Sequence, residues 1–135
     1  MDIGKLNSAL EAIIEKKLQL GELDYSSEKY DEVEEELHDL EDDLIDEYGE
    51  YLEEVLHEIH DEYCPDNDIL LPTAYLAKIY IKKEDGTYDV TTDQGVIVDA
   101  DDYPGKISRL VFLPNPMRIV LMVENEIGVV VWKAS

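Results

Sequence analysis

Residues 28–63, EKYDEVEEELHDLEDDLIDEYGEYLEEVLHEIHDEY, hold eighteen carboxylates and one cation, Lys29. This stretch carries a formal charge of −17, out of −23 for the whole chain of 135 residues. Apolar residues recur within it at steps of three and four: Val33, Leu37, Leu40, Leu44, Tyr48, Leu52, Val55, Ile59 and Tyr63. Such spacing is typical of one face of an amphipathic helix, so the stretch predicts a long helix with a charged outer side.

Two residues decide how far this helix runs. Gly49 lies in its middle, where glycine costs about 1 kcal/mol relative to alanine. We expect either a bend at Gly49 or two shorter helices that meet there. Pro65 ends the segment, because the residue before a proline avoids the helical region. A second apolar stripe, which starts at Ile3 and reaches Leu18, predicts a preceding helix over residues 2–20.

The apolar period changes from 3.6 to 2 after Leu70, which indicates strands. The segments that read as strands are 75–82, 88–92, 96–98, 107–113, 118–123 and 127–132. Asp85-Gly86 and Glu124-Asn125-Glu126 indicate tight hairpins between them. The fold class that follows is α+β. Two or three N-terminal helices pack on a twisted five- or six-stranded antiparallel meander.

The chain has the length of one domain, so we expect a single domain over residues 1–135. Its acidic helical half covers residues 1–64 and its sheet half covers residues 69–134. The last two predicted strands are apolar on both faces, although helices can cover one face of a sheet only. The sheet must then curl over itself or pair with a second copy, and we expect a homodimer through the sheet face.

Composition excludes several classes of partner and compartment. A charge of −23 repels nucleic acids and anionic membranes, so we expect no direct contact with either. The single cysteine, Cys64, excludes an internal disulfide and fits a reducing compartment. The first residues lack the basic and apolar regions of a signal peptide, and no apolar run reaches the length of a membrane span. We therefore expect a cytoplasmic protein.

The carboxylates of the long helix suggest a binding function. Residues four apart on a helix rise about 6 Å, and phosphates on a DNA strand advance about 3.4 Å along its axis, so rows of acids approximate a phosphate backbone. The candidate partner-binding residues are Glu32, Glu35, Glu36, Asp39, Asp42, Asp43, Asp46 and Glu50. In composition these rows resemble the small acidic proteins that mimic DNA and the acidic immunity proteins that block basic nuclease toxins. The resemblance implies a basic protein surface as the partner.

Four other residues share one helical face at i, i+4, i+7 and i+11: Glu53, His57, His60 and Cys64. Their side chains are of the types that bind zinc. Helix geometry turns this face about 110° from the apolar stripe, so we expect it to face solvent. We accordingly expect no bound metal and no cofactor.

The sequence points away from an enzyme, because it contains no glycine-rich phosphate loop and no nucleophile elbow. Three functions remain open. The first is a non-enzymatic acidic protein that binds a basic surface as an inhibitor, immunity protein or nucleic-acid mimic. The second is a homodimeric domain whose charge serves solubility. The third is a small-ligand-binding or enzymatic domain with a pocket between helices and sheet.

Overall fold

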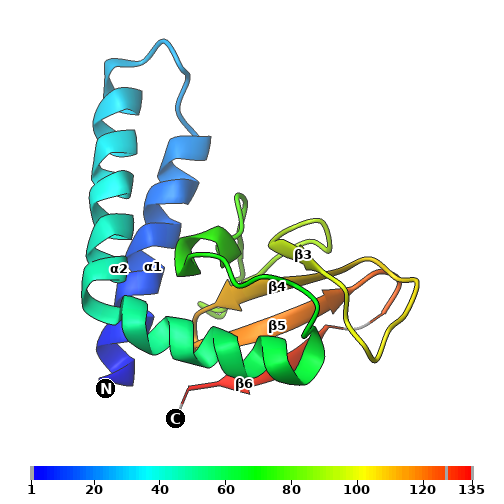
Figure 1. The fold of residues 1–135 in the computed structure, drawn as a ribbon. Helices are drawn as coiled ribbons and strands as arrows, with labels where there is room; N and C mark the ends of the chain where they lie inside the picture. The colour runs from blue at the N-terminus through cyan, green and yellow to red at the C-terminus, as the bar shows by residue number, and fades with distance from the viewer. Residues whose placement is uncertain (1, 127, 135) are drawn as a thin grey trace.

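Two long helices precede two small antiparallel sheets in the computed structural model, which describes residues 2–126 and 128–134 (Figure 1). The elements in chain order are α1 (Ile3–Gly21), α2 (Glu28–Tyr63), the 3-10 helix η1 (Pro72–Tyr75), β1 (Ile81–Lys82), β2 (Tyr88–Asp89), β3 (Val96–Val98), β4 (Ser108–Leu113), β5 (Arg118–Val123) and β6 (Val129–Lys133). This order confirms the predicted α+β class, with the helices first and the strands after them.

Short polar side chains start both helices. Asp2 caps α1 by accepting a hydrogen bond from the backbone N–H of Lys5, at 3.1 Å. Ser27 caps α2 in the same way, with the N–H of Lys29 as donor at 3.2 Å. Such caps satisfy N–H groups that have no partner within the helix. From these starts α1 and the first half of α2 run side by side as a helical hairpin (Figure 1).

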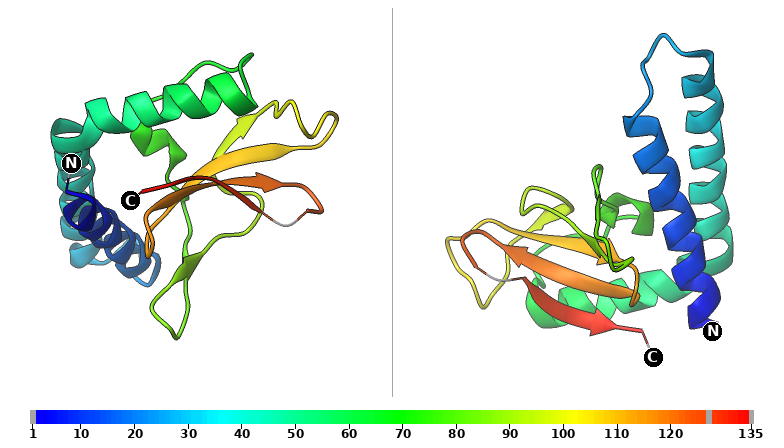
Figure 2. Two further views of the ribbon diagram at one scale, coloured as in Figure 1. Left: turned by 90° about the horizontal axis from the view of Figure 1, so that it is seen from below. Right: turned by 180° about the vertical axis from the view of Figure 1, so that it is seen from behind.

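Helix α2 continues unbroken through Gly49 over 36 residues, yet its axis turns sharply near the middle (Figures 1 and 2). The structure therefore shows a bend and not two separate helices. Gly49 is buried, and a Cβ atom built there would lie 3.5 Å from the nearest side-chain atom, Cγ2 of Ile45. This is ordinary van der Waals contact, so crowding does not impose the glycine.

The main sheet is a four-stranded antiparallel meander in the order β3-β4-β5-β6. Strands β4 and β5 pair along their full length, from Ser108 opposite Val123 to Leu113 opposite Arg118. Strands β1 and β2 form a separate two-stranded hairpin, which turns at Gly86 with a φ of 86°. The prediction of a single sheet with five or six strands is therefore wrong, whereas its antiparallel meander order is confirmed.

The first predicted strand, residues 75–82, fails because side chains satisfy its backbone. The N–H of Ala77 donates to the hydroxyl of Tyr80 at 3.0 Å, and the N–H of Lys78 donates to Oε1 of Gln94 at 2.9 Å. Backbone donors that find such acceptors do not need a neighbouring strand. In place of one long strand, the segment contains the last residue of η1, an irregular stretch over 76–80 and the short β1.

The second half of α2 and η1 cover one face of the four-stranded sheet (Figure 2). Two edge-to-face aromatic pairs mark this contact. The ring centroids of Tyr51 and Trp132 lie 6.2 Å apart, and those of Tyr75 and Phe112 lie 6.1 Å apart. Aromatic pairs of this geometry contribute about 0.5–1.5 kcal/mol beyond the area that they bury. The helical half and the sheet half thus share one core.

The other sheet face lies on the side of the β1–β2 hairpin (Figure 2, left). Val111 and Leu113 on this face are already buried within one chain. Ile97 and Val130 stay 59% and 52% exposed. The face that was expected to need a second copy is therefore partly covered by the chain itself.

The stripe of α2 gives a direct test of the fold. Leu44 is buried, and Leu44→Ala should lower the free energy of unfolding by about 2–4 kcal/mol, because it leaves a cavity between packed elements. Asp43→Asn changes the neighbouring exposed side chain and should change the free energy of unfolding by less than about 0.5 kcal/mol. Urea denaturation followed by circular dichroism measures both. Equal losses in the two variants would contradict this role for the stripe.

Candidate functional site

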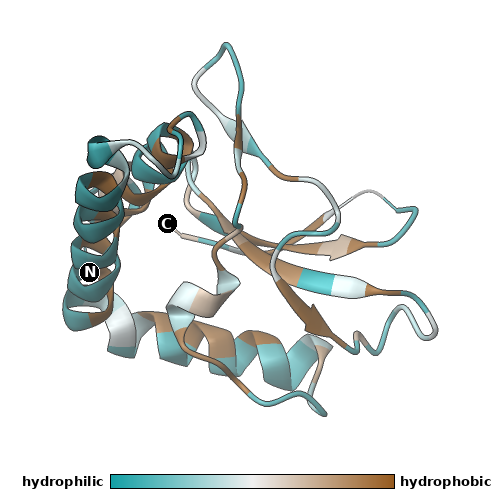
Figure 3. Ribbon diagram, turned by 90° about the horizontal axis from the view of Figure 1, so that it is seen from above, coloured by the Kyte–Doolittle hydropathy of each residue, from teal (hydrophilic) through white to brown (hydrophobic). Residues whose placement is uncertain are grey.

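The eight candidate partner-binding carboxylates, here called the acidic row, follow one side of α2. The row consists of Glu32, Glu35, Glu36, Asp39, Asp42, Asp43, Asp46 and Glu50. Helix geometry places them within an arc of about 120°, away from the apolar stripe. All are exposed except Glu36, which is half-buried. Figure 3 shows the same division, with hydrophilic colour on the outer side of the helices and hydrophobic colour on the central strands.

Most of the acidic row has no cation beside it. Four ion pairs occur in the part of the chain that the structure describes: Lys16–Glu36, Lys82–Glu15, Lys83–Asp89 and Lys106–Glu126. Glu36 is the one member of the row among them, and its pair with Lys16 joins α2 to α1. Glu36 therefore differs from the expectation, since it acts as an internal contact. The other seven carboxylates make no ion pair among the described residues.

Three of the four candidate metal ligands, Glu53, His57 and His60, line one surface pocket, whereas Cys64 does not. Glu53 and His57 are exposed, as expected, but His60 and Cys64 are 2% and 0% exposed. The expectation that all four face solvent is therefore wrong for the last two. The sequence missed this because the segment after α2 returns to contact His60, through Asn67. Within residues 2–126 and 128–134, no three of His, Cys, Asp and Glu gather closely enough to hold a metal ion.

His60 belongs to a buried hydrogen-bond network. Its Nδ1 lies 3.1 Å from the carbonyl oxygen of Asn67, and its Nε2 lies 2.8 Å from the hydroxyl of Tyr75. Because a carbonyl can only accept, Nδ1 carries a proton, and in the neutral imidazole Nε2 then accepts from the Tyr75 hydroxyl. The Tyr75 hydroxyl in turn accepts from the N–H of Leu70 at 3.1 Å. The network ties the segment after α2 to the helix, which is a structural role.

Cys64 lies at the C-terminal cap of α2, where its N–H donates to the carbonyl of His60 at 3.0 Å. Burial, together with the nearby charges of Asp101 and Asp99, raises the pKa of its thiol to about 11. A thiol with so high a pKa stays protonated at neutral pH and is a poor nucleophile. Cys64 and His60 therefore do not form a catalytic pair.

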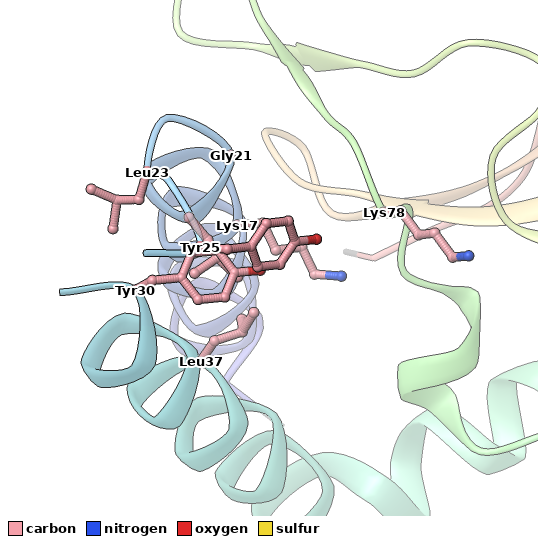
Figure 4. A pocket seen from close by; sticks show the side chains of 8 residues that line it. Lys17, Gly21, Leu23, Tyr25, Tyr30, Leu37 and Lys78 are labelled. Atoms are coloured by element: carbon pink, nitrogen blue, oxygen red, sulfur yellow. The ribbon is translucent and has the colours of Figure 1, made fainter. Parts of the chain in front are cut away.

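A surface pocket of about 340 Å³ was not predicted at all (Figure 4). It opens between the end of α1, the start of α2 and the segment before β1. Its lining residues are Lys17, Leu20, Gly21, Leu23, Tyr25, Tyr30, Leu37 and Lys78. They come from three parts of the chain, which the sequence does not show to be adjacent. The signal available was the pair Tyr25 and Tyr30, two aromatic residues at a polar turn between helices.

No protein-family model matches this chain, and no curated protein or solved structure is significantly similar to it. Neither α1 nor α2 combines the length and the apolar character that crossing a bilayer requires. The function must therefore be inferred from the chemistry of the acidic row, the His60 network and the pocket.

The buried network makes Tyr75→Phe informative. The substitution should lower the free energy of unfolding by about 1–3 kcal/mol, because Nε2 of His60 and the N–H of Leu70 both lose their partner. Tyr25→Phe is the matched control, since Tyr25 is 84% exposed and water replaces its contacts. Urea denaturation of both variants is the measurement. A loss no larger than that of the control would show that the network contributes nothing.

The burial of Cys64 predicts slow modification. At pH 8 the native protein should react with a thiol-specific disulfide reagent at least about 100-fold more slowly than the protein in urea, since two pKa units remove about 99% of the thiolate. The release of the coloured thiol is followed by absorbance. Similar rates in both conditions would place Cys64 at the surface.

Proposed function

We propose that this protein is a non-enzymatic binding protein that uses the acidic row to engage a basic protein surface. Inhibitors, immunity proteins and nucleic-acid mimics work in this way. The observation that carries the proposal is the set of seven exposed carboxylates on one helix face that have no ion pair among the described residues. A rigid helix holds them at fixed spacing, so the partner meets a preformed surface.

Repulsion within the acidic row favours such a partner. Asp39 with Asp43 and Asp42 with Asp46 are like charges at i, i+4, and each pair costs a few tenths of a kcal/mol. A basic surface relieves this repulsion on binding. It also associates faster, because the negative field steers a cation toward the row. The same field opposes direct contact with nucleic acids and anionic membranes.

The residues with catalytic chemistry support a binding role over an enzymatic one. His60 uses both ring nitrogens within the fold, and the Cys64 thiol is buried with a raised pKa. Their functional groups are therefore committed to structure. A buried, reduced thiol also fits the cytoplasm as the site of action.

A homodimer through the sheet face stays a prediction alongside this function. Ile97 and Val130 are the exposed apolar residues that support it. The area is smaller than expected from the sequence, because Val111 and Leu113 are buried within the chain. A solubilising role of the charge is the competing explanation of the acidic row.

Two variants with the same change in charge separate binding from solubility. The row variant carries Asp39→Asn, Asp42→Asn, Asp43→Asn and Asp46→Asn. The control variant changes four exposed acids elsewhere: Asp66→Asn, Asp68→Asn, Asp101→Asn and Asp102→Asn. Each protein is immobilised, exposed to native cell extract at low salt, and eluted with a salt gradient. A basic partner should be retained by the wild type and the control and should leave the row variant at much lower salt.

Two outcomes would contradict the proposal. If both variants lose the partner equally, net charge and not the acidic row determines retention. If the wild type retains no basic protein at low salt, the charge serves solubility.

A further inference from the structure

The pocket between the two helices differs in charge from the rest of the surface. Its lining includes Lys17 and Lys78 and no carboxylate. Four other surface pockets each carry at least two carboxylates, for example Asp93 with Glu124 or Glu15 with Glu22. The chain as a whole has 34 acids and 11 bases, so a lining with cations and no acid runs against its composition. This pocket is therefore suited to an anion.

Lys17 is a half-buried cation in the lining of this pocket. Its Nζ donates to the carbonyl oxygen of Ala77 at 3.0 Å, and it takes part in no ion pair among the described residues. An ammonium has three N–H donors, so two remain for another acceptor. Burial lowers the pKa of Lys17, although Glu41 acts in the opposite direction. An anion in the pocket would give Lys17 the close ion pair that it lacks among the described residues.

The tyrosines add both hydrogen-bond donors and an apolar wall. The rings of Tyr25 and Tyr30 pack with centroids 4.7 Å apart. Figure 4 shows their hydroxyls and the ammonium of Lys17 on the same side of the tyrosine rings, while the ammonium of Lys78 lies farther off and points away from them. Leu20, Leu23 and Leu37 also line the pocket, and Figure 4 shows the side chain of Leu23 pointing away from Lys17 and the tyrosine hydroxyls. A polar end and an apolar wall within one pocket select a ligand that has both characters.

We infer that this pocket binds a small organic acid, a carboxylate attached to an apolar aliphatic or aromatic body. The carboxylate accepts hydrogen bonds from Lys17 and from the hydroxyls of Tyr25 and Tyr30, and the body packs against the leucines and the tyrosine rings. A volume of about 340 Å³ lies within the range of small-ligand sites. The site stands apart from the proposed function, because none of its lining residues belongs to the acidic row.

The test is a titration of the ¹⁵N-labelled protein with 4-phenylbutyrate, followed by amide chemical shifts. Physiological salt limits repulsion by distant carboxylates to about 8 Å. The neutral 4-phenylbutyramide and inorganic phosphate are titrated in parallel. The acid should cause saturable shifts around Gly21 and Leu37. The amide and phosphate should each bind at least about tenfold more weakly than the acid, because the amide lacks the charged hydrogen bond and phosphate lacks the apolar body.

Variants identify the cation. Lys17→Met should weaken 4-phenylbutyrate binding by about tenfold. Lys5→Gln changes an exposed lysine outside the pocket and should leave binding unchanged. If Lys17→Met does not fold, the comparison of acid with amide on the wild type still decides. Absence of saturable shifts, equal binding of acid and amide, equal binding of acid and phosphate, or an equal loss with Lys5→Gln would overturn the inference.

Discussion

One apolar stripe on α2 has to be buried against two different surfaces. Its first half packs on α1, and its second half packs on η1 and the four-stranded sheet. A straight helix of 36 residues would extend over about 54 Å and could not follow both. The bend solves this problem, because it turns the same stripe from the helical hairpin onto the sheet. Leu44 and Leu56 are buried residues of this continuous apolar side.

Burial of this stripe also determines where charge can lie. Each large aliphatic side chain that is buried contributes about 1.5–3 kcal/mol, whereas each like-charge pair at i, i+4 costs a few tenths. The stripe can therefore offset the repulsion of many carboxylates on the opposite side. Ion pairing relieves little of that repulsion, because the pair of Lys16 with Glu36 is the one that α2 makes among the described residues. The acidic row persists because hydrophobic packing holds the helix together.

The sequence predicts the elements that depend on local chemistry. The apolar period marks α1 and α2, and Asp85-Gly86 forms the turn between β1 and β2. The fate of residues 75–82 could not be predicted, because Gln94, a distant residue, accepts hydrogen bonds from their backbone. The same limit applies to the site. Exposure of the acidic row follows from the helical period, whereas the burial of His60 depends on a returning segment.

The pocket likewise depends on tertiary contacts that the sequence does not show. Lys17 and Lys78 are 61 positions apart in the sequence, and no spacing rule connects them. The hydrogen bond of Lys17 to the carbonyl of Ala77 brings the two segments together. Contacts of this kind emerge from packing alone.

The bend in α2 has a consequence for dynamics. On one side of the bend the helix rests mainly on α1, and on the other side it rests on the sheet and η1. Amide protons in the first half can exchange with solvent when the helical hairpin opens, while those in the second half require loss of the common core. One continuous helix should thus contain two levels of hydrogen-exchange protection, with the step between them at the bend. The two halves of α2 pack against different elements. A continuous series of backbone hydrogen bonds therefore does not make the helix one cooperative unit.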